Sequence, residues 1–300
     1  MRLAAVCALL ADGLLGEPPP ALHPTVWMGR WVEAGRRAAG VRPASRFVLG
    51  AAIALGGAGI AAAAAGRLGG LVASIPSPAA AILEGLALKP ALAVRGLLDA
   101  GRMVEKALRD GDLPRARRLL SRHLVSRDTS DLSHSEVAGA AISSLAENLS
   151  DSVIAPLVAW RGAGLAGAYA YRFLNTADAM LGYRTAELEW LGKFAARSDD
   201  LVNILPARLS AFAIAAVAPL GEGSVLRSVH VAVRDAARTP SPNAGWPMAA
   251  MAGALNVRLS KRSVYRLHRE GGAPDASTLA RARVIVLAAA LLAAAAVTVS

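Results

Sequence analysis

The sequence predicts an all-α fold of the polytopic integral membrane class, a helical bundle with amphipathic cytoplasmic helices. Apolar residues make up 54% of the 300 residues and charged residues only 18%, with a mean hydropathy of +0.41. A soluble domain usually has about a quarter of its residues charged. The stretch 47–65 contains no charged residue and is long enough to cross a hydrocarbon core of about 30 Å as a helix. The net charge is +11, and the basic residues lie mainly between the apolar stretches. This pattern is typical of cytoplasmic loops in membrane proteins.

We expect residues 1–300 to form one membrane-embedded domain. Six apolar stretches are candidate membrane segments, and four or five of them are expected to span: 3–15, 47–65, 71–93, 153–174, 204–220 and 284–299. The first stretch resembles a signal peptide, but it contains Asp12 and no Ala-x-Ala cleavage site follows it, so we expect it to be retained. Arg161 and the glycines around it favour a re-entrant or protein-buried course for the fourth stretch.

A polar helical loop, 95–150, separates the third and fourth stretches. Residues 95–128 hold nine Lys/Arg and five Asp/Glu, and apolar residues recur there at helical spacing. Gly111 is expected to end the first helix, and a second helix is predicted from about Pro114 to Val125. Ser133-x-x-Glu136 reads as a capping box that opens a third helix toward Leu149. We expect these amphipathic helices to lie against the membrane or to form a cytoplasmic cap.

Composition and missing motifs exclude several classes of function. Aromatic residues are only 4% of the chain, which leaves little surface for stacking on bases, so no nucleic-acid partner is expected. Cys7 is the single cysteine, so an internal disulfide is excluded and no Cys/His metal spacing exists. The sequence contains no phosphate-binding Gly-x-x-x-x-Gly-Lys-[Ser/Thr] loop, no dinucleotide-binding unit and no Gly-x-Ser-x-Gly elbow.

Three polar clusters each place acids and amides at helical spacing beside an apolar stretch. Residues three or four apart share one helix face, and an acid buried there needs a cation or a partner. Magnesium meets that need because it takes carboxylate and amide oxygens and often bridges phosphates. Helix caps and Arg–carboxylate pairs are the alternative interpretation. The clusters are Ser144, Glu147, Asn148 and Asp151; Tyr171, Asn175 and Asp178; and Asp199, Asp200 and Asn203.

Cationic and amide side chains near the clusters are candidates for binding a substrate. Guanidinium groups bind phosphate or carboxylate through two hydrogen bonds. The alternative interpretation is that each arginine pairs with a neighbouring acid. His23 is either a proton acceptor near neutral pH or a structural residue. Asn243, in the rigid turn 241–247, presents its amide to a ligand or stabilises the turn. The arginines are Arg127 beside Asp128, Arg172, Arg184 and Arg208.

These segments together resemble the CobD/CbiB family, the adenosylcobinamide-phosphate synthases, over nearly the whole chain. The resemblance rests on an ordered set of short motifs that is specific as a set. Two positions depart from the family pattern: Glu17 stands where Asp is usual, and Ser152 where Gly is common. The motifs are 12–18, His23-Pro24, Gly29-Arg30, 111–113, 126–129, 144–151, 155–157, Tyr171-Arg172, 175–184, 199–208 and 241–247.

The resemblance implies a multi-pass enzyme of the cell membrane that acts in cobalamin synthesis. It implies ATP-dependent amide formation between a propionate of (adenosyl)cobyric acid and aminopropanol, usually as the O-phosphate, to give (adenosyl)cobinamide phosphate. ATP and Mg²⁺ are the expected cofactors. The expected partners are the corrinoid, aminopropanol phosphate, the lipid bilayer and other corrinoid-pathway enzymes.

The roles of single residues are our hypothesis and do not come from the family. Metal binding is assigned to Asp128, Glu147, Asn148 and Asp151. Proton transfer is assigned to Asp178, Asp199, Asp200 and His23. The alternative role of these three aspartates is to hold a second magnesium ion. Substrate and phosphate binding is assigned to Arg127, Arg172, Asn175, Arg184, Asn203, Arg208 and Asn243.

Three other functions stay open at this level. Another Mg²⁺-dependent membrane transferase is disfavoured because paired Asp-x-x-x-Asp runs are missing. An AmpE-like membrane sensor without catalysis is disfavoured because the motifs 175–184 and 199–208 are intact. A transporter is suggested only by charges near interrupted apolar stretches.

Overall fold

The structure, a computed structural model, describes residues 3–40, 42–183 and 185–299. Within them the chain is helical apart from connecting turns and one short antiparallel hairpin, so the predicted all-α class is confirmed. The chain packs into two compact units. Unit 1 comprises Met1–Ala93, Ala155–Asn203 and Ala294–Ser300, and unit 2 comprises Val94–Ile154 and Ile204–Ala293.

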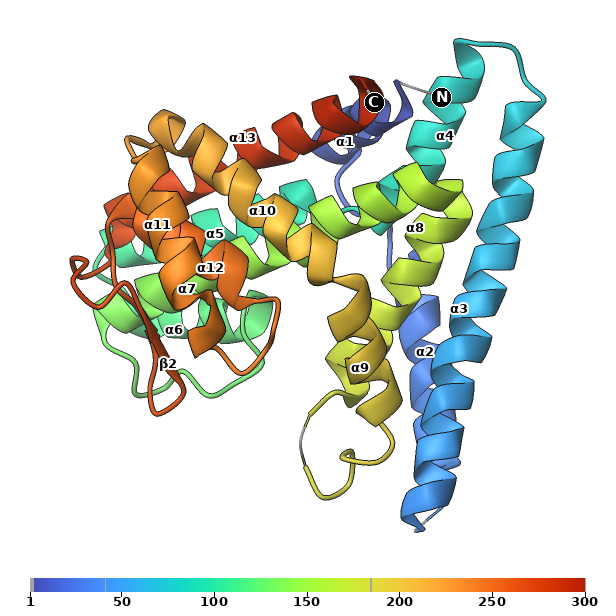
Figure 1. Ribbon diagram of the computed structural model, residues 1–300, viewed down its shortest axis with the longest axis horizontal. Coiled ribbons are helices and arrows are strands. Elements are labelled where there is room, and N and C mark those ends of the chain that lie inside the picture. The colour runs from blue at the N-terminus through green and yellow to red at the C-terminus, as the bar shows by residue number, and fades with distance from the viewer. Residues whose placement is uncertain (1–2, 41, 184, 300) are drawn as a thin grey trace. The chain divides into compact units, whose positions relative to one another are not determined.

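Unit 1 is built around the long helix α3, which packs against α2, α8 and α9 (Figure 1). Its buried core joins Met28 and Val32 of α2 to Ile53 and Ala54 of α3 and to Phe173 of α8. The elements of unit 1 are α1 (Ala4–Leu15), α2 (Pro24–Arg37), α3 (Pro43–Ala73), α4 (Ala79–Leu88), the 3₁₀ turn η1 (Lys89–Ala91), α8 (Ala155–Leu181) and α9 (Lys193–Val202).

A glycine allows α3 and α8 to approach closely. A Cβ atom built on Gly57 would lie 1.9 Å from the Phe173 ring, whereas one built on Gly59, on the same helix, meets nothing within 4 Å. Small residues at a helix contact are a general device for close packing in membrane proteins.

We therefore expect Gly57→Ala to destabilise the protein and Gly59→Ala to leave it unchanged or slightly more stable. Both substitutions gain helix propensity, but only the first forces an aromatic ring out of a packed core, at a cost of about 1–3 kcal/mol. Thermal unfolding of both variants in one detergent measures the difference. Equal melting temperatures would contradict the packing described.

Helix α8 is broken inside the segment 153–174. Ala163 (φ −142°) and Gly164 (φ +60°) are not helical, and a positive φ of this kind favours glycine. The same region packs tightly, because a Cβ on Gly167 would lie 2.3 Å from the carbonyl oxygen of Ala159. The segment is thus interrupted where the sequence places its glycines, and its re-entrant course remains a prediction.

Unit 2 contains the amphipathic helices expected from the polar loop. Gly111 has a φ of +73°, which suits the residue after a helix end. Both hydrogen bonds of the Ser133–Glu136 capping box are formed, so that prediction is confirmed. The elements are α5 (Val94–Arg109), α6 (Leu113–His123), α7 (His134–Leu149), the π turn η2 (Ser150–Ile154), α10 (Ile204–Val217), η3 (Ala218–Gly221), α11 (Val225–Asp235), η4 (Ala236–Arg238), α12 (Gly245–Leu255), β1 (Leu259–Lys261), β2 (Tyr265–Leu267) and α13 (Ala276–Val299), whose last turn belongs to unit 1.

Four helical stretches among the described residues are long and apolar enough to cross a membrane: Pro43–Ala73, His134–Leu181, Ile204–Gly221 and Ala276–Thr298. They contain the candidate segments 47–65, 153–174, 204–220 and, up to residue 298, 284–299. Segment 3–15 forms the short apolar helix α1. Segment 71–93 is divided into the end of α3, a turn, α4 and η1. These helices identify a membrane protein.

Candidate functional site

The second and third polar clusters meet between α8 and α9 of unit 1. The side-chain amides of Asn203 and Asn175 donate hydrogen bonds to the two carboxylate oxygens of Asp199, at 2.9 and 3.3 Å. The Tyr171 hydroxyl donates to Oδ1 of Asn203 at 2.9 Å, and Arg172 donates to Oδ1 of Asn175 at 3.4 Å. Because each amide carbonyl accepts one of these bonds, each amide NH₂ is turned toward the acid.

Asp199 is buried, and its environment favours a carboxyl that titrates near neutral pH. Burial raises the pKa of the Asp199 carboxyl from 3.8 to about 6. The hydrogen bonds from Asn175 and Asn203 oppose this rise, and the neighbouring charge of Asp200 adds to it. A carboxylate with such a pKa releases and accepts a proton at physiological pH, as a general base requires.

Four of the predicted site residues therefore belong to this network: Arg172, Asn175, Asp199 and Asn203. Tyr171 also belongs to the network, although no role was predicted for it. Its position four residues before Asn175 is the signal that could have included it. Asp178 lies one turn further along α8, close to Gly182, and Asp200 lines a neighbouring cavity. Arg184 lies outside the described residues.

The first polar cluster lies at the end of α7 in unit 2. The Ser144 hydroxyl donates to the carbonyl oxygen of Leu124 at 2.6 Å, and the Asn148 amide donates back to the Ser144 carbonyl at 2.9 Å. These bonds join α7 to the beginning of the loop that follows α6. Asp151 lies one turn further on, in the π turn η2. Turns of this kind are rare and frequently occur at functional sites.

Arg127, Glu147 and Tyr265 lie in one region of unit 2. Burial raises the pKa of the Tyr265 hydroxyl, the charge of Glu147 raises it further, and the charge of Arg127 lowers it. Tyr265 comes from β2, far along the chain, and sequence reasoning gave no signal for it. The hairpin thus brings a phenol to the predicted metal and phosphate residues.

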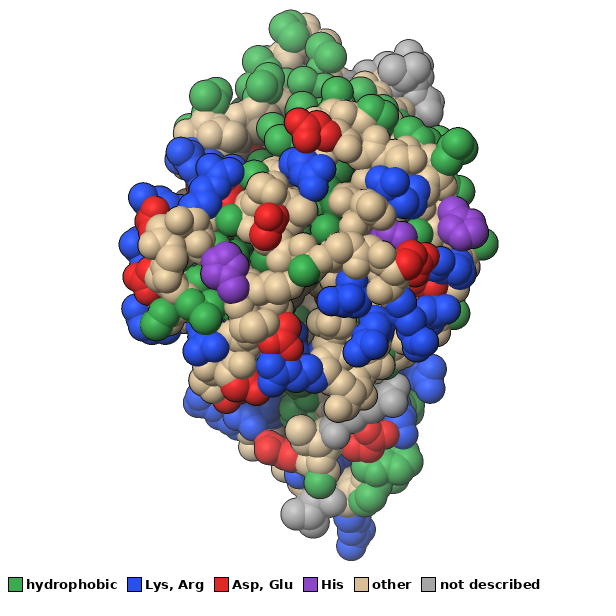
Figure 2. Space-filling model, turned by 90° about the vertical axis from the view of Figure 1, so that its left-hand side faces the viewer, with side chains coloured by type: hydrophobic (Ala, Val, Ile, Leu, Met, Phe, Trp, Pro, Cys, Tyr) green, Lys and Arg blue, Asp and Glu red, His purple; other side chains and the backbone are tan. Residues whose placement is uncertain are grey.

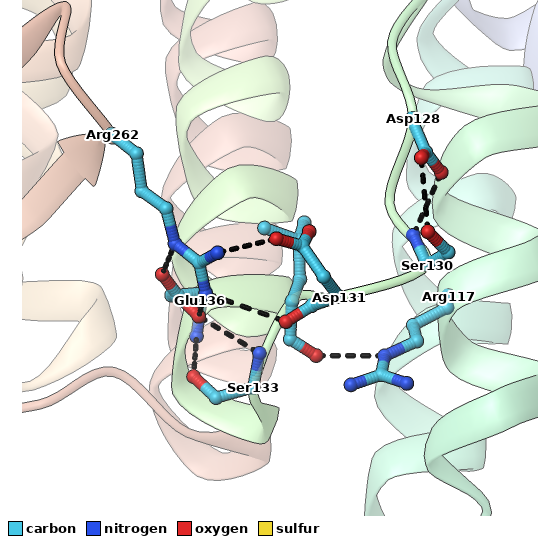
Figure 3. Close-up of polar contacts among 8 residues, drawn as sticks. Arg117, Asp128, Ser130, Asp131, Ser133, Glu136 and Arg262 are labelled. Atoms are coloured by element: carbon cyan, nitrogen blue, oxygen red, sulfur yellow. Dashed lines mark hydrogen bonds and ion pairs between the residues drawn. The ribbon is translucent and has the colours of Figure 1, made fainter.

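The loop 124–133, which contains the motif 126–129, is held in place by the hairpin and by α6. Arg262 forms hydrogen bonds with the carboxylates of Asp131 and Glu136, and Arg117 donates to the carbonyl of Leu132 at 2.7 Å (Figure 3). The Asp128 carboxylate turns toward its own loop, where the backbone N and hydroxyl of Ser130 both donate to it at 2.9 Å and lower its pKa.

We expect Arg262→Gln to loosen this loop while changing global stability little. Arg262 is 53% exposed, and exposed ion pairs contribute little to stability. Amide hydrogen exchange in residues 126–136 should become faster in this variant. Arg266→Gln, at an exposed arginine of the same hairpin, is the control. Unchanged exchange in both variants would show that Arg262 does not restrain the loop.

The predicted metal ligands lie at the end of α7, in the turn η2 and in the loop 124–133. Within the described part of the chain, no group of three or more His, Cys, Asp or Glu side chains is placed to hold a metal ion. Magnesium commonly uses only one or two carboxylates together with substrate phosphates and waters. Glu147 and Asp151, one turn apart at the end of α7, fit that mode of binding. Asp128 offers fewer free lone pairs, because Ser130 donates to both of its carboxylate oxygens. The amide nitrogen of Asn148 donates to Ser144, so Oδ1 is the atom of Asn148 that would bind the ion.

Arg208 and Asn243 form a second polar contact in unit 2. Arg208 donates to Oδ1 of Asn243 at 2.8 Å and lies over the Trp246 ring, 5.0 Å from its centroid. The Ser241 hydroxyl oxygen accepts bonds from the backbone nitrogens of Asn243 and Ala244. The turn 241–247 is therefore braced, and the partner of Arg208 is an amide rather than an acid.

The N-terminal motif forms a charge cluster in unit 1, in which Asp12 and Lys89 are buried and Glu17 is exposed. Nδ1 of His23 accepts bonds from the backbone and hydroxyl of Thr25, so Nε2 carries the proton and donates to Glu17 at 2.9 Å. Lys89 lies 3.2 Å from Glu17 and 3.7 Å from Asp12. Both ring nitrogens of His23 are thus engaged, and its role as a proton acceptor remains a prediction. Lys89, in an apolar stretch, was not expected to join this motif.

These features define a class: a helical membrane protein with buried acid–amide clusters at its apolar helices. The protein family described as "CobD/Cbib protein" matches residues 5–293. A probable cobalamin biosynthesis protein CobD of Methanothermobacter thermautotrophicus is 41% identical over 87% of this chain and 84% of its own length. The cobalamin biosynthesis protein CobD of Rhodobacter capsulatus is 40% identical over 92% of this chain and 89% of its own.

A third relative, the cobalamin biosynthesis protein CobD of Dehalococcoides mccartyi, is 38% identical over 88% of this chain and 86% of its own length. No solved structure was found to match the chain. The chain belongs to the CobD/CbiB family, whose members named here are cobalamin biosynthesis proteins.

Proposed function

We propose that this protein joins aminopropanol O-phosphate to a propionate of (adenosyl)cobyric acid, using ATP, to give (adenosyl)cobinamide phosphate. Family membership supports the pathway. The buried Asp199, held between two oriented amides, supports the amide-forming step. That single acid is the observation on which the proposal rests, because an incoming amine reaches the site as an ammonium and must lose a proton.

The chemistry requires an activated carboxylate. A propionate oxygen attacks the γ-phosphorus of ATP, ADP leaves, and an acyl phosphate forms. The amine nitrogen, once deprotonated, attacks the acyl carbon, the C–O bond to phosphate breaks, and inorganic phosphate leaves with its electron pair. The net result is an amide, ADP and phosphate.

Asp199 is proposed to accept the ammonium proton, with Asp178 and Asp200 as the alternative acceptors. Tyr171 and Arg172 are positioning residues, since they act on Asp199 through Asn203 and Asn175. Arg127, Arg172, Arg184 and Arg208 are proposed to neutralise phosphate charge. Glu147 and Asp151, with Asp128 and Asn148, are proposed to hold Mg²⁺, which when bound shields the charge of the nucleotide phosphates.

We also propose a multi-pass location in the cell membrane with the basic loops facing the cytoplasm. Figure 2 shows Lys and Arg side chains gathered on one face, with acidic side chains between them. Helix α6 illustrates the pattern, since Arg115, Arg118 and Arg122 are exposed while Ala116 and Leu120 are buried. A basic surface of this kind supports contact with anionic headgroups and with other corrinoid-pathway enzymes.

The test is a direct assay. The detergent-purified protein is supplied with adenosylcobyric acid, aminopropanol phosphate, ATP and Mg²⁺, and the corrinoid mass is followed. A gain of one aminopropanol phosphate minus water, dependent on ATP, is the expected result. If the assay shows no gain in mass and the protein does not bind the corrinoid, the ligase is rejected. That result would favour a non-catalytic membrane protein.

A further inference from the structure

A polar cavity of about 260 Å³ lies in unit 1, where the end of α8 meets the beginning of α9. Asp200 of α9 lines it, whereas Asp199, the residue before it on the same helix, faces Asn175 and Asn203. Most small-molecule pockets enclose about 300–1,000 Å³, so this cavity suits a ligand smaller than a typical drug and excludes a corrin ring. Its charged lining residues are Glu189, Lys193, Arg197 and Asp200, and Gly182 and Gly192 also line it.

Two glycines make the floor of this cavity possible. A Cβ on Gly192 would lie 1.8 Å from the carbonyl oxygen of Leu181, and a Cβ on Gly182 would lie 2.1 Å from Oδ1 of Asp178. The first turn of α9 therefore rests directly on the last turn of α8. Gly192 has no side chain with which to cap α9, so backbone N–H groups of the first turn are available to an anion.

The cavity lining presents charges of both signs. Lys193 and Arg197 lie one turn apart on α9, and Asp200 follows three residues later on the same face. Lys193 is held 3.1 Å from Glu189 and 4.0 Å from the centroid of the Trp190 ring. A ligand with one anionic and one cationic end matches this arrangement better than a simple anion does.

We propose that this cavity binds the small amine substrate as an amino-alcohol phosphate. The phosphate pairs with Arg197 and the first turn of α9, and the ammonium pairs with Asp200. Each end of the ligand then meets a group of opposite charge on α9. This assignment rests on the proposed function for the identity of the ligand.

Binding to the full-length protein in detergent tests this assignment without requiring turnover. The probes are aminopropanol O-phosphate, aminopropanol and inorganic phosphate, measured by calorimetry at low ionic strength because exposed charges are screened by salt. Arg197→Gln should weaken aminopropanol O-phosphate and inorganic phosphate at least about tenfold, as expected for a lost charge-assisted hydrogen bond, and leave aminopropanol unchanged. Asp200→Asn should weaken the two amines and leave inorganic phosphate unchanged.

Arg37→Gln is the matched control, because Arg37 is 76% exposed, pairs with Glu33 and does not line the cavity. Equal affinities in Arg197→Gln and Arg37→Gln would overturn the assignment. So would loss of phosphate binding in Arg197→Gln with no effect of Asp200→Asn on either amine, which would mark a plain anion site. Melting temperatures near that of the unmodified protein show that the variants are folded.

The two proposals fail separately. If the unmodified protein forms the amide but the cavity variants bind all probes normally, the cavity assignment is wrong and the ligase stands. If the variants behave as expected but no amide forms under any condition, the ligase is wrong and the binding site stands.

Discussion

Asp199→Asn is expected to lower turnover by about two to four orders of magnitude, the usual contribution of a general base, with corrinoid binding retained. The asparagine has nearly the shape of the aspartate but cannot accept a proton. The NH₂ of the new asparagine also faces the NH₂ groups of Asn203 and Asn175. Tyr171 and Arg172 hold those two amides in the orientation in which they donate. The measurement is the initial rate of corrinoid amidation at saturating substrates.

The same residue predicts the acid side of the pH profile. Turnover of the unmodified protein should rise as the pH passes about 6, the pKa of Asp199, because only the ionised carboxylate accepts a proton. Asp199→Asn should lack that limb. Asp110→Asn, at an acid whose side chain is 48% exposed and lies 3.4 Å from Lys106, is the control and should keep it. A variant with full activity and the same profile would exclude Asp199 as the proton acceptor.

Stability should depend on pH in the opposite sense. The pKa of Asp199 is raised in the folded state, so folding favours its protonated form, and this contribution is complete below about pH 3.8 and lost as the pH rises through about 6. The shift corresponds to about 3 kcal/mol. Melting temperatures between pH 4.5 and 7.5 should therefore fall more steeply for the unmodified protein than for Asp199→Asn. Parallel curves would contradict the burial argument.

Asp151→Asn is expected to abolish turnover while corrinoid binding persists. The amide is nearly isosteric, so the π turn η2 should keep its shape, but the negative charge that attracts Mg²⁺ is removed. A second readout is independent of catalysis: Mg²⁺ should strengthen the binding of a non-hydrolysable ATP analogue in the unmodified protein and not in the variant.

Two further variants complete this test. Asp151→Glu restores the charge and should recover part of the magnesium effect. Asp99→Asn, at an exposed acid of α5 that lies 3.6 Å from Arg95, should behave as the unmodified protein. Normal turnover in Asp151→Asn would reject the magnesium role, and a magnesium effect that persists there would assign the ion to other ligands.

Several local features were predictable because their causes lie within a few residues. The capping box at Ser133 and Glu136, the helix end at Gly111 and the apolar stretch 47–65 all follow from spacing and composition. The division of segment 71–93 was not predicted. Its prolines and charged residues were visible, but only packing decides that Glu84 accepts a bond from Trp160 at 3.0 Å and that Lys89 reaches Glu17.

The candidate site shows the same division. Helical spacing placed Tyr171, Asn175 and Asp178 on one stripe, and Asp199 and Asn203 on another, because residues three or four apart share a helix face. It could not show that the two stripes meet, with one acid between two amides. Nor could it bring Tyr265 from β2 toward Glu147.

The sequence by itself determined the helical membrane class, the family motifs and the residue types available for chemistry, because hydropathy, helical period and capping are local properties of the chain. The tertiary structure alone decided which of those residues form one network, how deeply Asp199 is buried and where a cavity opens between α8 and α9. Those properties depend on contacts between residues that are distant along the chain, and close approach at Gly57 and Gly192 permits such contacts.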